Sequence, residues 1–178
     1  MRCTPYLLSD DGLIPNHPAL PLLVYEGGLS LAGPDPAVIA EETFRRNGWG
    51  RSWRNGIYPF HHYHSTAHEV LSIVRGWAKV QLGGEQGITL TVAAGTVLVL
   101  PAGTGHKRLD ASGDLLVVGA YPQGQTWDLC RGTTAERATA LANIRRVPLP
   151  DTDPLFGETG LLVELWLNPN HQQSEERR

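Results

Sequence analysis

The central part of the chain, residues 57–121, alternates short apolar runs with breaks that contain glycine. The run ITLTV at 88–92 alternates apolar and polar positions, as a half-buried strand does, whereas TVLVL at 96–100 is mostly apolar and indicates a more deeply buried strand. The predicted strands are HEVLSIV (68–74), WAKVQL (77–82), GITLTV (87–92), GTVLVLP (95–101) and DLLVVGAY (114–121). Short strands at this spacing predict an all-β sandwich or barrel.

Helical patterns lie on both sides of this region. Asp35 is a suitable N-cap with Pro36 at the first helical position, and the dipeptide NG at 47–48 ends the pattern, which predicts a helix of about three turns. A second helix is predicted where Thr133 and Glu136 have the spacing of a capping box. Both helices are expected to cover the strands.

The chain has 178 residues, a length that suits one domain with elaborations at its ends. We expect a single domain over 1–178, because no repeat and no second composition class is visible. Its parts are an N-terminal extension with a short strand at 20–25 and a helix (1–50), a barrel core (51–122), a C-terminal helix and strand (123–168) and a flexible tail (169–178). The apolar run LLVELWL at 161–167 is interpreted as that last strand or as an interface element.

Charge and hydropathy exclude several classes of protein. The net charge is −3, and Lys and Arg form no block longer than a pair, so the basic surface that nucleic acid requires is not expected. No apolar run approaches the roughly 20 residues of a membrane span, and the first residues lack the apolar core of a signal peptide. We therefore expect a cytoplasmic protein without membrane contact, in which the two cysteines, Cys3 and Cys130, are reduced thiols.

Candidate chemistry is concentrated in one short stretch. Four of the seven histidines lie within residues 61–68, and Glu69 follows them directly. Neutral imidazole and carboxylate are the nitrogen and oxygen donors that suit transition metals. The stretch therefore predicts a metal site, whereas no serine or cysteine has the context of an acyl-transfer nucleophile.

The spacing of this stretch identifies a family. Residues 56–76 read G-x5-H-x-H-x4-E-x6-G, and residues 95–110 read G-x5-P-x-G-x2-H-x3-D. These patterns resemble the two signature motifs of the cupin superfamily, except that Asp110 stands where the family commonly has Asn. The segment also resembles the YjlB-like group of bacterial single-domain cupins. The resemblance covers roughly residues 56–110 and implies a jelly-roll β-barrel with short flanking helices.

The resemblance also implies the ligands of one divalent transition metal, Fe, Mn, Ni or Zn: His62, His64, Glu69 and His106. Elementary geometry agrees, because alternate side chains of a strand share a face, so that His62 and His64 can converge on one point. Four such ligands either close a tetrahedral, structural zinc site or leave two positions open on an octahedral ion.

Two function classes follow from that choice. The first is a metalloenzyme of dioxygenase or isomerase type, acting on a small polar molecule through a His₃Glu centre. The second is a non-catalytic cupin in which a structural or ligand-clamping metal holds a small molecule. Cupins often pair, so a homodimer is expected in either case. No nucleic-acid partner is expected, since no helix-turn-helix pattern adjoins the barrel.

Neighbouring residues have two interpretations each. Tyr58 and Phe60 share the parity of the predicted ligands, so that their rings either line the substrate cavity or belong to the core. His61 and His68 have the opposite parity and are expected at the surface or in hydrogen bonds that support the ligands. Three tryptophans either pack over the mouth of the barrel or belong to its core: Trp49, Trp53 and Trp127.

Overall fold

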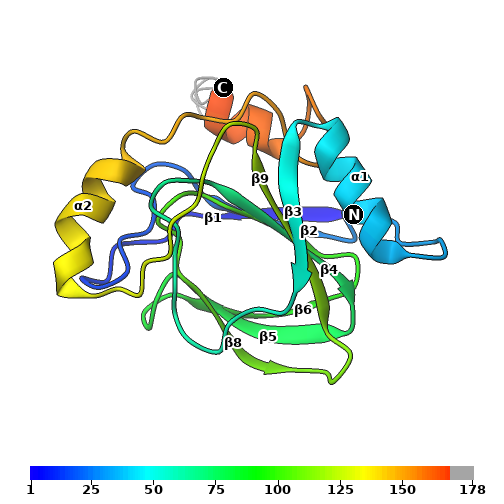
Figure 1. The fold of residues 1–178 in the computed structure, drawn as a ribbon, viewed down its shortest axis with the longest axis horizontal. Coiled ribbons are helices and arrows are strands. Elements are labelled where there is room, and N and C mark those ends of the chain that lie inside the picture. Colours follow the sequence, from blue (N-terminus) through cyan, green and yellow to red (C-terminus); the bar gives the residue numbers. More distant parts are fainter. Residues whose placement is uncertain (169–178) are drawn as a thin grey trace, which may run out of the picture.

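The fold is two antiparallel sheets that face each other, as a computed structural model shows for residues 1–168 (Figure 1). The six-stranded sheet has the order β1 (Arg2–Tyr6), β2 (Leu22–Glu26), β7 (Val97–Leu100), β4 (Glu69–Arg75), β9 (Leu116–Pro122) and β3 (Trp49–Asn55). The three-stranded sheet has the order β6 (Ile88–Ala93), β5 (Trp77–Leu82) and β8 (His106–Ala111). The helices are α1 (Pro36–Arg46), α2 (Thr134–Ile144) and η1 (Val163–Leu167). The predicted all-β jelly-roll barrel with short flanking helices is confirmed.

The six-stranded sheet is covered on both faces, which explains why its central strands are apolar almost throughout. Leu71 and Ile73 of β4 point between the two sheets, where they join Val80 and Leu82 of β5 in one buried cluster. Val70, from the same strand, points the other way into an outer cluster. A strand with two covered faces loses the apolar and polar alternation of a half-exposed one.

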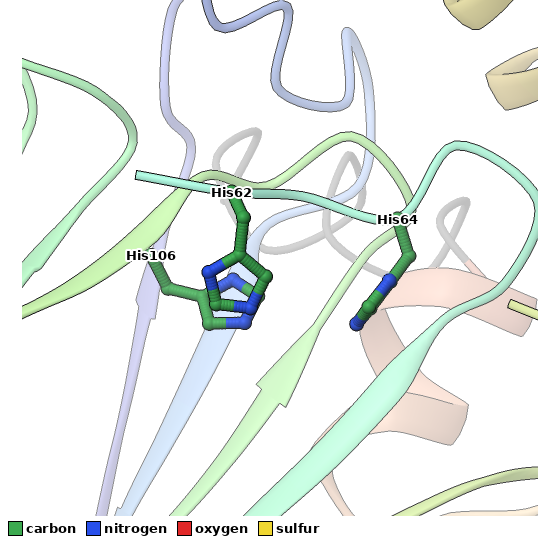
Figure 2. Close-up of side chains that lie close together, drawn as sticks. All are labelled: His62, His64 and His106. Atoms are coloured by element: carbon green, nitrogen blue, oxygen red, sulfur yellow. The ribbon is translucent and has the colours of Figure 1, made fainter. Parts of the chain in front are cut away.

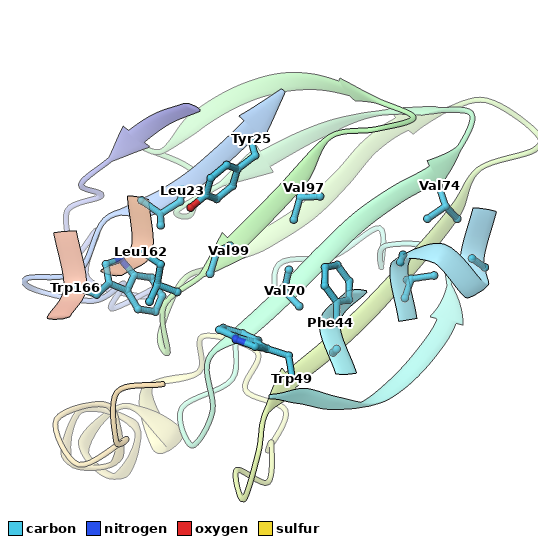
Figure 3. Close-up of a cluster of buried hydrophobic side chains, with 14 residues drawn as sticks. Leu23, Tyr25, Phe44, Trp49, Val70, Val74, Val97, Val99, Leu162 and Trp166 are labelled. Atoms are coloured by element: carbon cyan, nitrogen blue, oxygen red, sulfur yellow. The ribbon is translucent and has the colours of Figure 1, made fainter. Parts of the chain in front are cut away.

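The outer cluster is formed by the sheet, α1 and the C-terminal segment (Figure 3). Phe44 of α1 and Trp49 of β3 lie in it, both buried. Burying one such side chain contributes about 1.5–3 kcal/mol. The cluster fixes β4 from behind, so that the inward face of this strand is held in place.

Both predicted helices are confirmed at their caps. Asp35 accepts a hydrogen bond from the backbone N–H of Ala37, and Pro36 occupies the first position of α1. Thr133 and Glu136 form the reciprocal capping box of α2. Local sequence was sufficient in these two places because a cap needs residues only three positions apart.

The strand predicted at 161–167 is wrong, since this segment is helical and ends in η1. Leu162 and Trp166, four positions apart, both enter the outer cluster, which is the spacing of a helix face. Trp166 Nε1 also donates to the carbonyl oxygen of Pro21 at 3.0 Å. A short apolar run fits the periodicity of a helix as well as that of a strand, and here tertiary packing favours the helix. The predicted flexible tail, 169–178, lies outside the described residues.

Three strands were not predicted, namely β1, β3 and β8, and all are edge strands of their sheets. Each carries polar residues at positions that an inner strand would fill with apolar ones, for example WGRSWRN in β3. Edge strands commonly carry such residues, which protect the open edge from pairing with other chains. Hydrophobic patterning therefore finds the centre of each sheet more readily than its borders.

Two expectations about cysteines and membranes can be compared with the structure. Cys3 and Cys130 are both free thiols. Burial, followed by the charge of Asp153, raises the pKa of Cys3 to about 11. Among the helices of residues 1–168, none has the length and apolar character needed to cross a membrane.

Candidate metal centre

The segment 62–64 runs between two other parts of the chain and pairs with both. His62 and His106 exchange backbone hydrogen bonds of 3.3 and 3.0 Å, and Tyr63 exchanges bonds of 3.0 and 2.9 Å with Cys130 on the opposite side. Tyr63 is buried in a separate small cluster with Cys130. His62 and His64 therefore point together toward the barrel interior, although the segment forms isolated bridges and no continuous strand.

Two further elements complete the site. His106 is the first residue of β8, and Glu69 is the first residue of β4, on the inward face that it shares with Leu71. The turn before His106 requires glycine, because Gly103 has φ +91° and a Cβ there would come within 2.9 Å of the Asn16 carbonyl oxygen. Gly103 N–H donates to the carbonyl oxygen of His64 at 2.8 Å, which ties the turn to the ligand segment.

The three histidines converge, as Figure 2 shows. Ligand nitrogens of His62, His64 and His106 all lie within 4.8 Å of one another, and all three side chains are buried. The rings of His62 and His106 lie side by side with centroids 4.0 Å apart, while the ring of His64 lies 5.8 Å from that of His62. The structure thus places three of the four predicted ligands within metal-binding distance of one another.

Glu69 approaches two of these imidazoles. Its Oε2 lies 3.3 Å from His64 Nε2 and 3.4 Å from His106 Nε2. Burial alone would raise the pKa of Glu69, but the neighbouring His64 and His106 outweigh it and hold that pKa below its usual range. The carboxylate is therefore ionised, and it faces the same small volume as the imidazole nitrogens.

The opposite ring nitrogens fix the tautomers. Nδ1 of His62 lies 3.4 Å from the Phe60 carbonyl oxygen, and Nδ1 of His106 lies 3.1 Å from that of Thr104. Nδ1 of His64 faces the Asp128 carbonyl oxygen. Because a carbonyl only accepts, each Nδ1 carries a proton, and Nε2 is the ring nitrogen left to face a metal ion. Burial, followed by the neighbouring His106, lowers the pKa of His62 to about 3, so that this ring is neutral.

These donors fit a divalent metal ion. Glu69 Oε2 is buried and has no hydrogen-bond donor within residues 1–168. It lies 3.3 Å from His64 Nε2 and 3.4 Å from His106 Nε2, so the carboxylate and the imidazole nitrogens share one small buried volume. A buried carboxylate in such a place requires a cation, and imidazole with carboxylate is a donor set for Fe, Mn, Ni or Zn.

Asp128 supports His64, and no pattern in the sequence indicates this contact. Its carboxylate accepts from Ser65 N–H at 2.6 Å, from Ser65 Oγ at 2.5 Å and from Thr66 N–H at 3.3 Å, while its carbonyl holds His64 Nδ1. Burial would raise the pKa of Asp128, but the hydrogen bonds from Ser65 outweigh it and lower that pKa. Asp128 lies 63 positions beyond Ser65, and only folding reveals the contact.

A cavity of about 320 Å³ opens from the histidine cluster. Its lining comprises Trp53, Arg54, Asn55, Gly56, Ile57, Tyr58, His62, His64, Glu69, Leu71, His106, Tyr121, Trp127 and Leu129. Tyr58 is in this lining, whereas Phe60 is not and instead stacks on Tyr58 with ring centroids 4.8 Å apart. Of the three tryptophans considered for the barrel mouth, Trp49 belongs to the core, and Trp53 and Trp127 line the cavity.

The other two histidines of the stretch lie outside the group of three. His61 Nδ1 lies 3.3 Å from Glu85 Oε1, on the side away from the cavity. His68 is fully buried, and its Nδ1 accepts from the backbone N–H of Ala102 at 2.9 Å. His68 thereby braces the loop that leads to His106, which agrees with the supporting role expected for it.

Known proteins resemble this chain at the level of sequence and of fold. No family model matches the chain. The chain is 43% identical over 162 residues to uncharacterized protein YjlB of Bacillus subtilis (strain 168), and the match covers 91% of this chain and 95% of the relative.

Solved structures match over shorter segments. Acireductone dioxygenase from Bacillus anthracis, with a cadmium ion in its active centre, matches 61% of this chain and 82% of its own at 14% identity and a TM-score of 0.41. A DUF861 family protein from Thermotoga maritima matches 53% of this chain and 98% of its own at 22% identity and a TM-score of 0.31. Procruciferin, an 11S globulin of Brassica napus, matches 55% of this chain and 28% of its own at 15% identity and a TM-score of 0.38.

Proposed function

Because this chain belongs to the YjlB-like family of single-domain cupins, we propose that it is a metal-dependent enzyme acting on a small polar molecule. His62, His64, Glu69 and His106 hold one divalent ion in this proposal, which is Fe, Mn, Ni or Zn. The reaction is of dioxygenase or isomerase type.

One observation carries the proposal. Three buried imidazoles, whose Nδ1 atoms face backbone carbonyls, stand beside a buried carboxylate oxygen that receives no hydrogen bond within the described part of the chain. The backbone carbonyls that hold the Nδ1 protons keep the rings in this tautomer before any ion arrives. A site arranged in this way suits a divalent cation.

The cavity beside the cluster supports an enzyme over a closed structural site. When bound, a divalent ion supplies a Lewis acid for a substrate oxygen or a centre for dioxygen. The side chains of the chain itself orient the substrate and limit the access of water, since the cavity is lined by four aromatic side chains besides the histidines. A closed structural site would have no need of such a cavity.

Tyr121 contributes a polar group to this cavity. Its hydroxyl accepts a hydrogen bond from Trp53 Nε1 at 3.0 Å, which leaves its own proton free to point elsewhere. Burial and the neighbouring Glu69 carboxylate raise the pKa of Tyr121, so the phenol keeps that proton at neutral pH. We assign Tyr121 as a positioning residue for Glu69.

The test is turnover that depends on the loaded site. Protein purified without oxygen is reconstituted separately with Fe, Mn, Ni and Zn and incubated with a panel of small oxygen-bearing molecules, with and without dioxygen. We expect turnover by the wild-type protein and none by a His62→Ala, His106→Ala double variant. Consumption of dioxygen with iron identifies a dioxygenase, and activity under argon identifies an isomerase. A filled metal site without turnover across the panel contradicts the enzyme and leaves the non-catalytic binding cupin.

A further inference from the structure

Aromatic rings stand on both sides of the histidine cluster. The ring of Tyr58 meets that of His62 edge-on with centroids 5.1 Å apart, and the ring of Tyr121 meets that of His64 edge-on at 5.9 Å. Trp127 stacks on Tyr121 at 4.1 Å with an interplanar angle of 7°. Tyr58, Tyr121 and Trp127 all line the cavity, so a ligand that reaches the cluster passes between these rings.

Each aromatic wall is supported from behind. Phe60 lies parallel to Tyr58, and the guanidinium of Arg131 lies 3.7 Å from the centroid of the Phe60 ring. On the other side, the guanidinium of Arg51 lies 5.4 Å from the Trp127 ring. Stacked and cation–π pairs of this kind are worth about 0.5–1.5 kcal/mol each.

The outermost rings are nevertheless exposed to a large extent, Tyr58 to 49% and Trp127 to 39%. Neighbouring residues hold such an exposed aromatic ring in one orientation. Binding a ligand on its flat face therefore costs little side-chain entropy. The supported pairs therefore have the properties of binding walls.

The charges of the lining favour a ligand with an apolar body. The charged lining residues are Glu69, which faces the cluster, and Arg54. Arg54 is already paired with Glu41 at 2.8 Å and with Asp35 at 3.1 Å, so its charge is committed to α1 and the residue before it. The walls away from the cluster thus offer rings and aliphatic groups, and few of the hydrogen-bond partners that a polyhydroxylated sugar would need.

We propose that the substrate is a small molecule with one aromatic ring that bears adjacent oxygen donors. The ring lies between Tyr58 and the stacked pair of Tyr121 and Trp127, and the oxygens reach the centre formed by the three histidines and Glu69. A volume of about 320 Å³ is near the lower end of the 300–1,000 Å³ usual for ligand pockets and accommodates a single ring system. This inference rests on the proposed function, because the oxygens need a metal ion to bind to.

Two chelating probes test the role of the rings. The probes are 4-nitrocatechol, which is aromatic and coloured, and acetohydroxamate, which offers a similar oxygen pair without a ring. Dissociation constants are measured under argon on zinc-loaded protein, since zinc does not oxidise the catechol. The comparison is made within each probe, between the wild-type protein and Tyr58→Leu, Trp127→Leu and the double variant.

We expect each single variant to weaken 4-nitrocatechol binding by about two- to ten-fold and the double variant by about four- to 100-fold, as the loss of one or two ring contacts predicts. In the same variants the affinity for acetohydroxamate stays within about two-fold of the wild-type value. The matched control is Trp77→Leu, because Trp77 is exposed to the same 39% as Trp127 and lies in β5 outside the cavity lining. This variant binds both probes as the wild-type protein does.

Zinc content, measured on every sample, separates the two proposals. If the variants contain full zinc and bind both probes equally more weakly, or bind neither more weakly, the aromatic substrate is ruled out. The metal site is not affected by that result. Wild-type protein that takes up none of Zn, Fe, Mn and Ni overturns both. Trp127 adjoins Asp128, so if Trp127→Leu loses zinc, Tyr58→Leu alone decides the question.

Discussion

His64 is held by a residue from a distant part of the chain, and this contact is decisive at the scale of single residues. Asp128 places its carbonyl at His64 Nδ1 and its carboxylate at the two residues that follow His64. Hydrogen bonds to a charged group are the stronger kind, and groups that orient a metal ligand commonly set its affinity. Asp128 is thus expected to control how well His64 binds.

Replacing Asp128 by Asn removes the charge and places an amide group among donors from Ser65 and Thr66. We expect unfolding free energy to fall by about 1–3 kcal/mol and zinc affinity to fall by about 10- to 100-fold. Urea unfolding and competition with a chelator measure the two effects. Asp114→Asn is the control, since Asp114 is exposed. Zinc affinity within two-fold of the wild type would show that the Asp128 carboxylate does not help to position His64.

The four side chains that meet in the candidate metal centre could be predicted from sequence, but the residues that support them could not. His62, His64 and Glu69 lie within eight positions, so strand geometry alone places the two histidines on one face. The placement of Phe60 shows the limit of that reasoning. Its parity is that of Tyr58, yet its ring stacks behind Tyr58 and outside the cavity lining. Parity gives a direction, whereas packing decides which ring reaches the cavity.

At the scale of elements, the close approach of β3 to β9 shapes one wall of the cavity. Trp53 of β3 pairs with Gly119 of β9, and a Cβ at Gly119 would lie 2.2 Å from the Trp53 ring. The ring can lie over the neighbouring strand only because that position has no side chain. In this place Trp53 lines the cavity and donates to Tyr121.

Gly119→Ala is therefore expected to displace the Trp53 ring. Unfolding free energy should fall by about 1–3 kcal/mol, the usual cost of overpacking a core, and 4-nitrocatechol affinity should fall with it. Chemical denaturation and probe titration provide the measurements. Gly50→Ala in β3 is the matched control, because a Cβ at Gly50 meets no atom within 4 Å. Equal stability of the two variants would contradict this account of the wall.

Elements were predictable from sequence where their signals are local. The caps of α1 and α2 and the buried strands met this condition, and the edge strands β1, β3 and β8 did not. The segment 161–167 has the weakest local signal, because an apolar run of seven residues suits a strand as well as a helix. Its helical form follows from the outer cluster that it joins, and that cluster exists only in the folded chain.

At the scale of the whole molecule, the C-terminal segment closes the outer face of the large sheet. Asp153 anchors it, because this buried carboxylate accepts hydrogen bonds from the hydroxyl of Tyr25 in β2 and from the backbone of Leu155, Phe156 and Leu162. Burial and the charge of Asp153 raise the pKa of Tyr25. The anchor therefore depends on a neutral phenol.

Stability should accordingly fall at high pH. A phenol whose pKa is raised by folding stabilises the protein fully below its unfolded pKa of about 10 and loses that contribution as pH rises further. We expect the urea midpoint of the wild-type protein to fall more between pH 8 and pH 10.5 than that of Tyr25→Phe, which cannot ionise at this position. At pH 8 the variant is the less stable by about 1–3 kcal/mol, since Asp153 loses a donor. Parallel pH profiles would contradict the role of Tyr25.

We also predict that the whole molecule pairs into a homodimer, as the family resemblance implies. A chain of 19.4 kDa should then elute with twice that mass in light scattering after size exclusion. A mass of one chain at micromolar concentration would contradict this prediction.

Metal content shows directly whether the three histidines and Glu69 bind an ion. The wild-type protein, purified without oxygen, is compared by elemental analysis with the His62→Ala, His106→Ala double variant. His61→Ala is the control, because His61 adjoins a ligand but faces Glu85. We predict about one Fe, Mn, Ni or Zn per chain in the wild type and the control and loss of it in the double variant. No metal in any sample, even after reconstitution, would show that the three histidines and Glu69 do not act together as a metal site.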